Sequence, residues 1–114
     1  MSSCIFCRIV QRQLPAKILY EDSLCLAFED LSPKAPSHAL IIPKKHVESL
    51  NSIEEADDLA IGRLFLVAKS LAYQKGIALS GYRIVINTGS EAGQSVFHLH
   101  LHLLGGRPMT WPPG

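Results

Sequence analysis

The first thirty positions of the chain alternate between short apolar clusters and turn residues. Residues 4–10 place apolar side chains three and four positions apart, which predicts a short helix that ends before Leu14 and Pro15. Residues 18–21 and 25–29 are rich in strand formers and are separated by turn residues. They predict a β-hairpin that follows the helix.

The middle of the chain combines one compact apolar run with the longest helical pattern. Residues 38–42 are an apolar run stopped by Pro43, which is typical of a central strand. Further along, residues 52–55 (Ser-Ile-Glu-Glu) fit a capping box, in which a Ser hydroxyl and a Glu carboxylate satisfy the first amides of a helix. We expect that helix to end at Gly76 and to bury one apolar stripe, made of Ala60, Leu64, Val67, Ala68 and Leu71.

The last third predicts two more strands around a turn-prone loop. Residues 82–87 and 96–104 are rich in strand formers, and residues 88–95 between them are rich in turn formers. Residues 105–114 contain three prolines and can form neither a helix nor an inner strand. The whole pattern predicts an α+β fold, with residues 1–114 forming a single domain of about five antiparallel strands, one long helix and a short N-terminal helix.

Alternating histidines mark the last predicted strand, where residues 98–104 are His-Leu-His-Leu-His-Leu-Leu. Successive side chains of a strand point to opposite faces, so His98, His100 and His102 share one face and the leucines share the other. Residues two apart on a strand are separated by roughly 6.5–7 Å. All three imidazoles can therefore engage a single phosphate and its leaving group.

Two other interpretations fit the same triplet. The first is a solvated polar face, but such a face usually carries Thr, Lys or Glu, whereas clustered imidazoles repel one another when protonated. The second is a zinc site, because three His can hold Zn²⁺ with one position open for water. The preceding loop favours phosphate instead: Gly89 and Gly93 allow close backbone approach, and Gln94 and Ser95 add hydrogen-bond donors.

Composition limits the classes of partner and compartment. The 114-residue chain has a formal charge of +1. A protein that binds a nucleic-acid polymer usually carries a much larger positive charge, so we expect no such partner. The charge does not exclude binding of a single nucleotide. We expect no membrane span and no secretion signal. Three cysteines cannot all pair within the chain, so we expect a reducing, cytoplasmic location.

Residues 98–104 match the His-φ-His-φ-His-φ-φ signature (φ apolar) of the histidine triad (HIT) family at every position, and nearly the whole chain resembles that family. The Hint branch, which comprises purine nucleoside phosphoramidases, looks most similar, and within it the zinc-containing bacterial-type members. Galactose phosphate transferases of the superfamily carry Gln at the third triad position, so His102 disfavours them. The segments that carry the resemblance to Hint proteins are 15–17, 28–30, 36–38, 42–46, 87–89, 93–95 and the ending 111–114.

The resemblance implies a histidine nucleophile. His100 would attack the α-phosphorus of a nucleoside phosphoramidate and form a nucleotidyl-histidine, which divides one difficult displacement into two easier ones. His102 would bind phosphate oxygens, Ser95 would help to deliver a proton to the departing amine, and His38 would support the triad. Without the resemblance, Ser95 would equally well cap its loop, and His38 would be a buried histidine satisfied by the backbone.

The same resemblance implies a site for an AMP-like purine nucleotide and no organic cofactor. Asp30 would accept hydrogen bonds from the ribose hydroxyls, apolar residues would enclose the purine, and the loop before the histidines would bind phosphate. Most of these residues would otherwise be expected in the core or in turns. The set comprises Leu14, Phe28, Asp30, Leu31, Asn87, Gly93, Gln94, Ser95, Val96, His100 and His102.

Cys4 and Cys7 form a CxxC pair, which brings two thiols within reach of one metal ion. By the resemblance, His46 and His98 complete a structural zinc site, in which His98 orients its strand instead of acting as an acid or base. The other interpretations of the pair are a redox couple, which the missing βαβ context disfavours, and two buried thiols. Cys25 lies among apolar strand residues and is expected in the core.

The leading functional hypothesis is therefore a hydrolase of the adenosine 5′-monophosphoramidase type. A dinucleoside polyphosphate hydrolase and a non-catalytic nucleotide-binding or regulatory module are the alternatives. The resemblance also implies a homodimer whose two sheets join edge to edge into one continuous sheet. Residues 105–114 would then form a tail that contributes to the dimer and to the partner's active site, with Trp111 as an apolar anchor.

Overall fold

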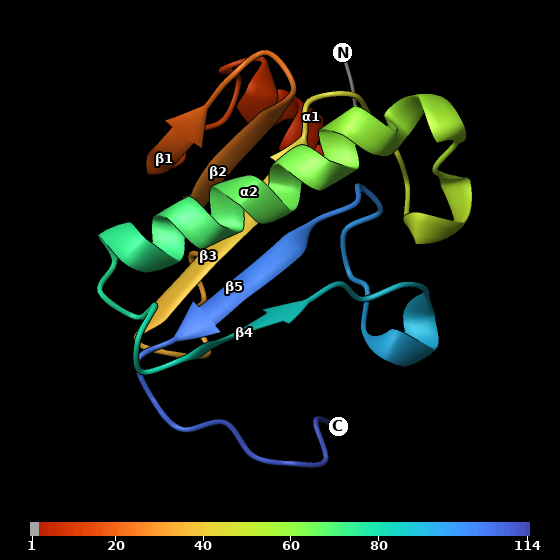
Figure 1. Cartoon of the computed structure of the whole chain (residues 1–114). Coiled ribbons are helices and arrows are strands. Elements are labelled where there is room, and N and C mark those ends of the chain that lie inside the picture. The colour runs from red at the N-terminus through yellow and green to blue at the C-terminus, as the bar shows by residue number, and fades with distance from the viewer. Residues whose placement is uncertain (1–2) are drawn as a thin grey trace.

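The computed structural model describes residues 3–114 and contains one antiparallel sheet of five strands in the order β1-β2-β3-β5-β4 (Figure 1). Its elements confirm the predicted α+β class, with one long helix and a short N-terminal helix. Among the described residues, no helix combines the length and the hydropathy that crossing a membrane requires. The helices and strands are α1 (Ile5–Val10), β1 (Ile18–Glu21), β2 (Cys25–Glu29), β3 (Ser37–Pro43), α2 (Asp58–Gln74), β4 (Tyr82–Val85) and β5 (Leu101–Gly105).

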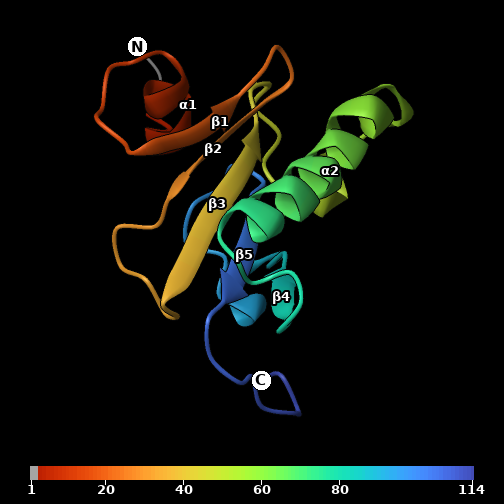
Figure 2. The ribbon, with the colours of Figure 1, turned by 60° about the vertical axis from the view of Figure 1, so that its left-hand side comes forward.

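The two helices lie on opposite faces of the sheet (Figure 2). Alternation along the strands gives each face its own apolar cluster. On the α2 face, buried residues of the helix such as Leu64 and Leu71 pack against the sheet, where Ile41 and Leu101 are buried. On the α1 face the cluster consists of Phe6, Ile9, Leu26, Phe28, Leu40 and Ile42. The central strand β3 is therefore covered on both sides, as its continuous apolar run indicates.

The hairpin of β1 and β2 turns at Asp22. The Asp22 carboxylate accepts hydrogen bonds from the backbone N–H groups of Leu24 (2.8 Å) and Cys25 (2.9 Å) and from the Tyr20 hydroxyl (2.7 Å). Arg63 of α2 donates to the same carboxylate at 2.7 Å. Burial alone would raise the pKa of Asp22, but these donors hold it well below its usual range. The hairpin is thus joined to α2 at its turn.

The start of α2 differs from the sequence-based expectation. The helix begins at Asp58, and two short 3₁₀ turns, Leu50–Ser52 and Glu55–Asp57, precede it where its first turn was expected. The capping box consists of Glu54 and Asp57, in place of the predicted Ser and Glu of residues 52–55. Each carboxylate can satisfy a backbone N–H of the other residue, so the box lies two residues later in the chain.

The end of α2 agrees with the prediction at Gly76. This residue adopts φ +73°, and its N–H donates to the carbonyl of Tyr73 at 3.1 Å. The N–H of Ile77 donates to the carbonyl of Ala72 at 3.0 Å. This pair of bonds is a Schellman motif, which favours glycine because the conformation is left-handed.

The last two strands are shorter than predicted. β5 begins at Leu101, so residues 96–100 lie outside the ladder, and β4 ends at Val85. β3 ends at Pro43, and the last β3–β5 pair is Ile41 with Leu101. Beyond that pair, the N–H of Leu99 donates to the carbonyl of Val47 at 2.7 Å. The segment before β5 is therefore held by the loop after β3, not by strand pairing.

Candidate active site

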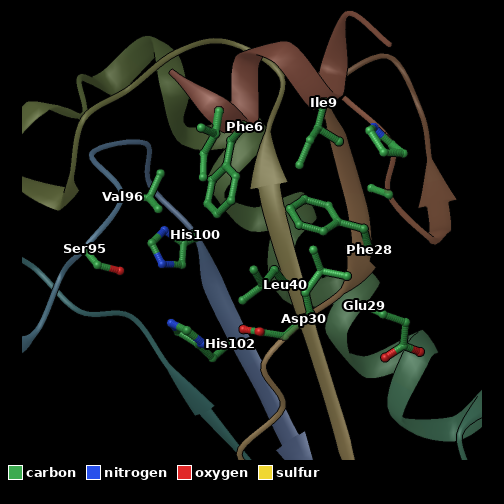
Figure 3. Close-up of a pocket in the computed structure, with 14 residues that line it drawn as sticks. Phe6, Ile9, Phe28, Glu29, Asp30, Leu40, Ser95, Val96, His100 and His102 are labelled. Atoms are coloured by element: carbon green, nitrogen blue, oxygen red, sulfur yellow. The ribbon is translucent and has the colours of Figure 1, made fainter. Parts of the chain in front are cut away.

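A pocket of about 270 Å³ opens on the α1 face of the sheet (Figure 3). Its floor is a cross-strand row in which Phe28 of β2 pairs with Leu40 of β3, and Leu40 pairs with His102 of β5. Figure 3 shows an apolar side formed by Phe6, Ile9, Phe28 and Leu40, and a polar side where His100, His102, Ser95 and Asp30 gather. One cavity thus offers an apolar surface beside a cluster of hydrogen-bonding groups.

The structure places the expected nucleotide-binding residues in two groups. Those that line the pocket are Phe28, Asp30, Leu31, Ser95, Val96, His100 and His102. Those that do not line it are Leu14, Asn87, Gly93 and Gln94, and Leu14 packs instead against the apolar cluster beneath α1. Sequence reasoning missed Ile5, Phe6, Ile9, Pro15, Ala16, Glu29 and Leu40.

The predicted phosphate loop uses its amides internally. The N–H of Gly93 donates to Ser90, and that of Gln94 donates to Gly89. The buried Gln94 side chain accepts from the N–H of Gly89 at 2.9 Å and donates to the carbonyls of Glu48 (2.7 Å) and Val96 (3.2 Å). The Gly93 and Gln94 amides therefore hold the loop together and do not point at a ligand, whereas Ser95, the next residue, reaches the pocket.

The tautomer of His100 follows from a backbone contact. Its Nδ1 lies 2.7 Å from the carbonyl oxygen of His98. Because a carbonyl only accepts, this nitrogen carries the proton, and the lone pair of a neutral ring is on Nε2. The His100 side chain lines the pocket while only 6% of its residue surface is exposed. A shielded imidazole with an unprotonated nitrogen is a competent nucleophile.

The tautomer of His102 follows from a chain of two contacts. The N–H of Lys34 donates to Nδ1 of His38 at 3.0 Å, so the proton of a neutral His38 is on Nε2. That Nε2 lies 2.9 Å from Nδ1 of His102, which must accept. The proton of His102 is then on Nε2. Burial, followed by the neighbouring His100 and His38, lowers the pKa of His102 to about 4, so the ring is neutral at pH 7.

Asp30 completes this polar cluster. Its Oδ2 lies 3.4 Å from Nε2 of His38, and its Oδ1 accepts from the N–H of Ser32 at 2.7 Å. Burial lowers the pKa of His38, while the Asp30 charge opposes that effect. Asp30, His38 and His102 are close enough to hold a metal ion. The hydrogen bond between the two rings already accounts for their approach.

The family model described as the HIT domain matches residues 11–109 of the chain. The chain belongs to the HIT family. An uncharacterized HIT-like protein of Synechocystis sp. is 54% identical over 110 residues, which cover 96% of each protein. The structure of a HIT family hydrolase from Legionella pneumophila is 49% identical, with a TM-score of 0.96 over 98% of this chain and 100% of that one. A histidine triad nucleotide-binding protein from Candida albicans is 33% identical, with a TM-score of 0.82 over 96% of this chain and 83% of that one.

The HIT protein has a second cluster outside the pocket, centred on His98. The Nε2 of His98 lies 2.8 Å from the carbonyl oxygen of Pro43, so Nδ1 of a neutral ring carries the lone pair. That Nδ1 lies 3.4 Å from Sγ of Cys4, 3.5 Å from Sγ of Cys7 and 3.2 Å from Nδ1 of His46. His98 is fully buried, and its burial lowers its pKa to about 4. It faces the thiols instead of the pocket.

The geometry of this second cluster fits a tetrahedral metal ion. The four side chains of Cys4, Cys7, His46 and His98 bring one ligand atom each within 4.8 Å of the others. A tetrahedral site with metal–sulfur distances of about 2.3 Å and metal–nitrogen distances of about 2.0 Å needs ligand atoms about 3.3–3.8 Å apart. Four of the six pairs of ligand atoms lie 3.2–3.5 Å apart, close to this requirement. The HIT domain match begins after both cysteines.

Proposed function

We propose that this HIT protein is a Hint-type hydrolase that cleaves the phosphorus–nitrogen bond of purine nucleoside phosphoramidates. The observation that carries the proposal is the pair of opposite tautomers in one pocket. His100 has its lone pair on Nε2, and His102 has its proton on Nε2. Family membership supports the same class of reaction, because the solved Legionella relative is described as a HIT family hydrolase.

The two tautomers assign complementary tasks. The lone pair of His100 Nε2 attacks the α-phosphorus and forms a phosphorus–nitrogen bond, while the bond to the leaving amine breaks and its electron pair goes to that amine. The N–H of His102 donates to a phosphate oxygen as negative charge develops there. Ser95 lies at the same side of the pocket and assists protonation of the amine. Water then hydrolyses the nucleotidyl-histidine to release the nucleoside monophosphate.

The rest of the pocket suits a nucleoside. The apolar side, which includes Phe6, Ile9 and Phe28, provides a surface for a planar purine. Asp30 lies between this side and the histidines, where its carboxylate can accept hydrogen bonds from ribose hydroxyls. The nucleotide-binding description of the Candida relative supports an AMP-like ligand.

We also propose that Cys4, Cys7, His46 and His98 bind a structural zinc ion. Zn²⁺ would accept four protein ligands there, which leaves no open position for catalysis, so its contribution would be to stabilise the fold. The donor set and the separations support this assignment. His98 would then serve as a ligand, and its carbonyl would orient His100.

A homodimer is part of the proposal. β4 is an edge strand of the sheet, so it can pair with β4 of a second copy and form one continuous sheet. The tail bears Trp111, which is 81% exposed in the single chain. A large ring on a proline-rich tail has an apolar surface that a partner can cover. In the proposed dimer the tail extends toward the partner's pocket.

Turnover assays test the proposed activity. Adenosine phosphoramidate and a diadenosine polyphosphate are given to the enzyme in parallel, and we expect hydrolysis of the first to dominate. A His100→Asn variant is expected to bind AMP and lose turnover, and a slow substrate is expected to add a nucleotidyl mass on His100. Faster cleavage of the diadenosine compound, or tight AMP binding without any turnover, would replace the proposal with one of the two alternative functions. A nucleotidyl adduct on His98 or His102 would overturn the assignment of the nucleophile.

A further inference from the structure

Helix α1 contributes to both the metal cluster and the pocket. Cys4 is its N-cap and Cys7 lies within it, and these two residues supply both thiols of the metal cluster. From the same six-residue helix, Ile5, Phe6 and Ile9 line the pocket; we call these three residues the α1 wall. A change in the position of α1 therefore affects both sites at once.

Besides the metal cluster, α1 packs on the sheet through Phe6 and Ile9, with Val10 partly buried beside them. Only Phe6 and Ile9 of the helix are buried, whereas α2 has seventeen residues and buries five of them. A helix of six residues has little stability of its own. The exposed ion pair between Arg12 and Glu21, just beyond the helix, contributes little because such pairs are well solvated. Ligation of one ion by Cys4, Cys7, His46 and His98 would link α1 to the loop after β3 and to the segment before β5.

Phe6 connects the two sites directly. Its ring packs edge-on against His98 with centroids 5.9 Å apart, and against His100 with centroids 5.2 Å apart. A third edge contact joins Phe6 to Phe28 at 5.4 Å. One ring thus contacts a proposed metal ligand, the proposed nucleophile and the apolar side of the pocket. Figure 3 shows Phe6 between His100 and Phe28.

We infer that metal occupancy of the Cys4/Cys7/His46/His98 cluster controls nucleotide affinity, because ligation holds the α1 wall against the pocket. The inference rests on the proposed function for the identity of the nucleotide. Linkage makes the effect reciprocal: if the metal ion tightens nucleotide binding by some factor, the nucleotide tightens metal binding by the same factor. The metal site would then be a regulatory input to the pocket as well as a stabilising one.

Calorimetric titrations of the whole chain with AMP and with inorganic phosphate test the inference. Zinc-loaded protein is compared with chelator-treated protein and with a Cys4→Ser variant. We expect AMP to bind about tenfold more weakly without the metal, within the usual range of coupling between sites. Phosphate, which engages the histidines but not the α1 wall, is expected to change by less than about twofold. Equal AMP affinity in both states, or equal losses for AMP and phosphate, would overturn the inference.

Hydrogen exchange distinguishes a local effect from general unfolding. Without the metal, amides of α1 are expected to exchange faster while those of β3 and β5 keep their protection. Loss of protection throughout the sheet would show that the metal supports the whole fold, and the inference would be wrong. In the reciprocal experiment, a chromophoric chelator competes for Zn²⁺, and saturating AMP is expected to raise zinc affinity about tenfold. Unchanged zinc affinity would also overturn it.

Two controls separate this inference from the proposed activity. Cys25→Ala removes the third cysteine, which is buried in the other apolar cluster, and is expected to leave zinc content and AMP affinity unchanged. Hydrolysis of adenosine phosphoramidate by the zinc-loaded protein is measured separately. If that protein binds AMP but does not turn over the substrate, the proposed function fails while the coupling still stands. If the zinc-loaded and zinc-free proteins bind AMP equally well and turnover is normal, the coupling fails while the proposed function stands.

Discussion

The Nε2 of His38 lies 2.9 Å from Nδ1 of His102, and this contact determines which nitrogen of a neutral His102 carries the proton. His38 can donate there because its own Nδ1 accepts from the backbone N–H of Lys34. A backbone amide in the loop before β3 thus sets the protonation of two rings in succession. In the proposed reaction, His38 would therefore be a positioning residue that acts through His102.

Replacing His38 tests this positioning role. In His38→Ala, Nδ1 of His102 loses its donor, so the ring can move its proton to Nδ1 and lose the donor at Nε2. We expect kcat for a phosphoramidate to fall by about a hundredfold, the scale of a lost proton donor, with little change in KM. In His38→Gln the side-chain amide can still donate and should restore most of the rate. Nitrogen NMR of His102 reports the tautomer, and an unchanged tautomer with an unchanged kcat in the Ala variant would contradict the role.

The depressed pKa of His102 predicts an acid-sensitive fold. Burial lowers the pKa of His102 from 6.5 to about 4, so between these values the unfolded chain binds a proton that the folded chain does not. The contribution of this residue to stability is full above pH 6.5 and is lost as the pH falls toward 4. The loss is on the order of 2 kcal/mol once solvent screening of the partly exposed ring is allowed for. Urea unfolding at pH 7 and at pH 4.5 measures the change.

His102→Asn is the matched control for the acid effect. Asn can still accept from His38 at the position of Nδ1, but it does not titrate. We expect its loss of stability between pH 7 and pH 4.5 to be smaller than that of the parent chain. If both proteins lose the same free energy of unfolding, other groups cause the acid sensitivity.

Most of the fold could be predicted because its signals are local. The hairpin, the central strand and the end of α2 at Gly76 each depend on a few adjacent residues, and each lies where the pattern places it. The start of β5 could not be located from local pattern. Residues 96–100 have strand-like alternation, but the backbone N–H of Leu99 donates to Val47, which is distant in sequence, instead of to a neighbouring strand. Leu99 still faces the α2 side of the core, and His100 still faces the pocket.

The candidate site shows the same limit at the level of side chains. The histidine pattern pointed to the triad, but periodicity cannot show which nitrogen of a ring carries the proton. That depends on the carbonyl of His98 and the amide of Lys34. The α1 wall was missed because apolar residues at helical spacing indicate a core face, and Phe6 and Ile9 are both core residues and pocket lining. No signal in the sequence separates these two tasks.

The displaced capping box gives a stability prediction. Asp57 is buried, accepts from the N–H of Glu54 at 2.9 Å and binds Lys45 at 2.8 Å. Asp57→Ala is expected to destabilise the protein by about 0.5–2 kcal/mol, the usual range for a lost cap. Ser52→Ala, at the position that the sequence suggested, is expected to change stability by less than about 0.5 kcal/mol. Urea unfolding of both variants checks this, and the opposite order would show that the cap lies at Ser52.

In the proposed dimer, the tail of one chain affects the substrate preference of the other chain's pocket. Residues 105–114 do not line the pocket of their own chain. The truncation must spare Arg107, because its guanidinium donates to the carbonyl of Lys34 at 3.0 Å, next to the amide that supports His38. Removing residues 109–114 is therefore the cleaner variant.

In the proposed dimer, this truncation should change kcat/KM unequally for phosphoramidates with small and bulky leaving amines. A change of about tenfold in their ratio corresponds to roughly 1.4 kcal/mol of differential contact in the transition state. Sedimentation of the same samples shows whether the variant is still a dimer. Trp111→Ala in the full-length chain should produce part of the same change, because the exposed ring is the main apolar group of the tail. Identical ratios in a truncated protein that remains dimeric would show that the tail does not reach the partner's pocket.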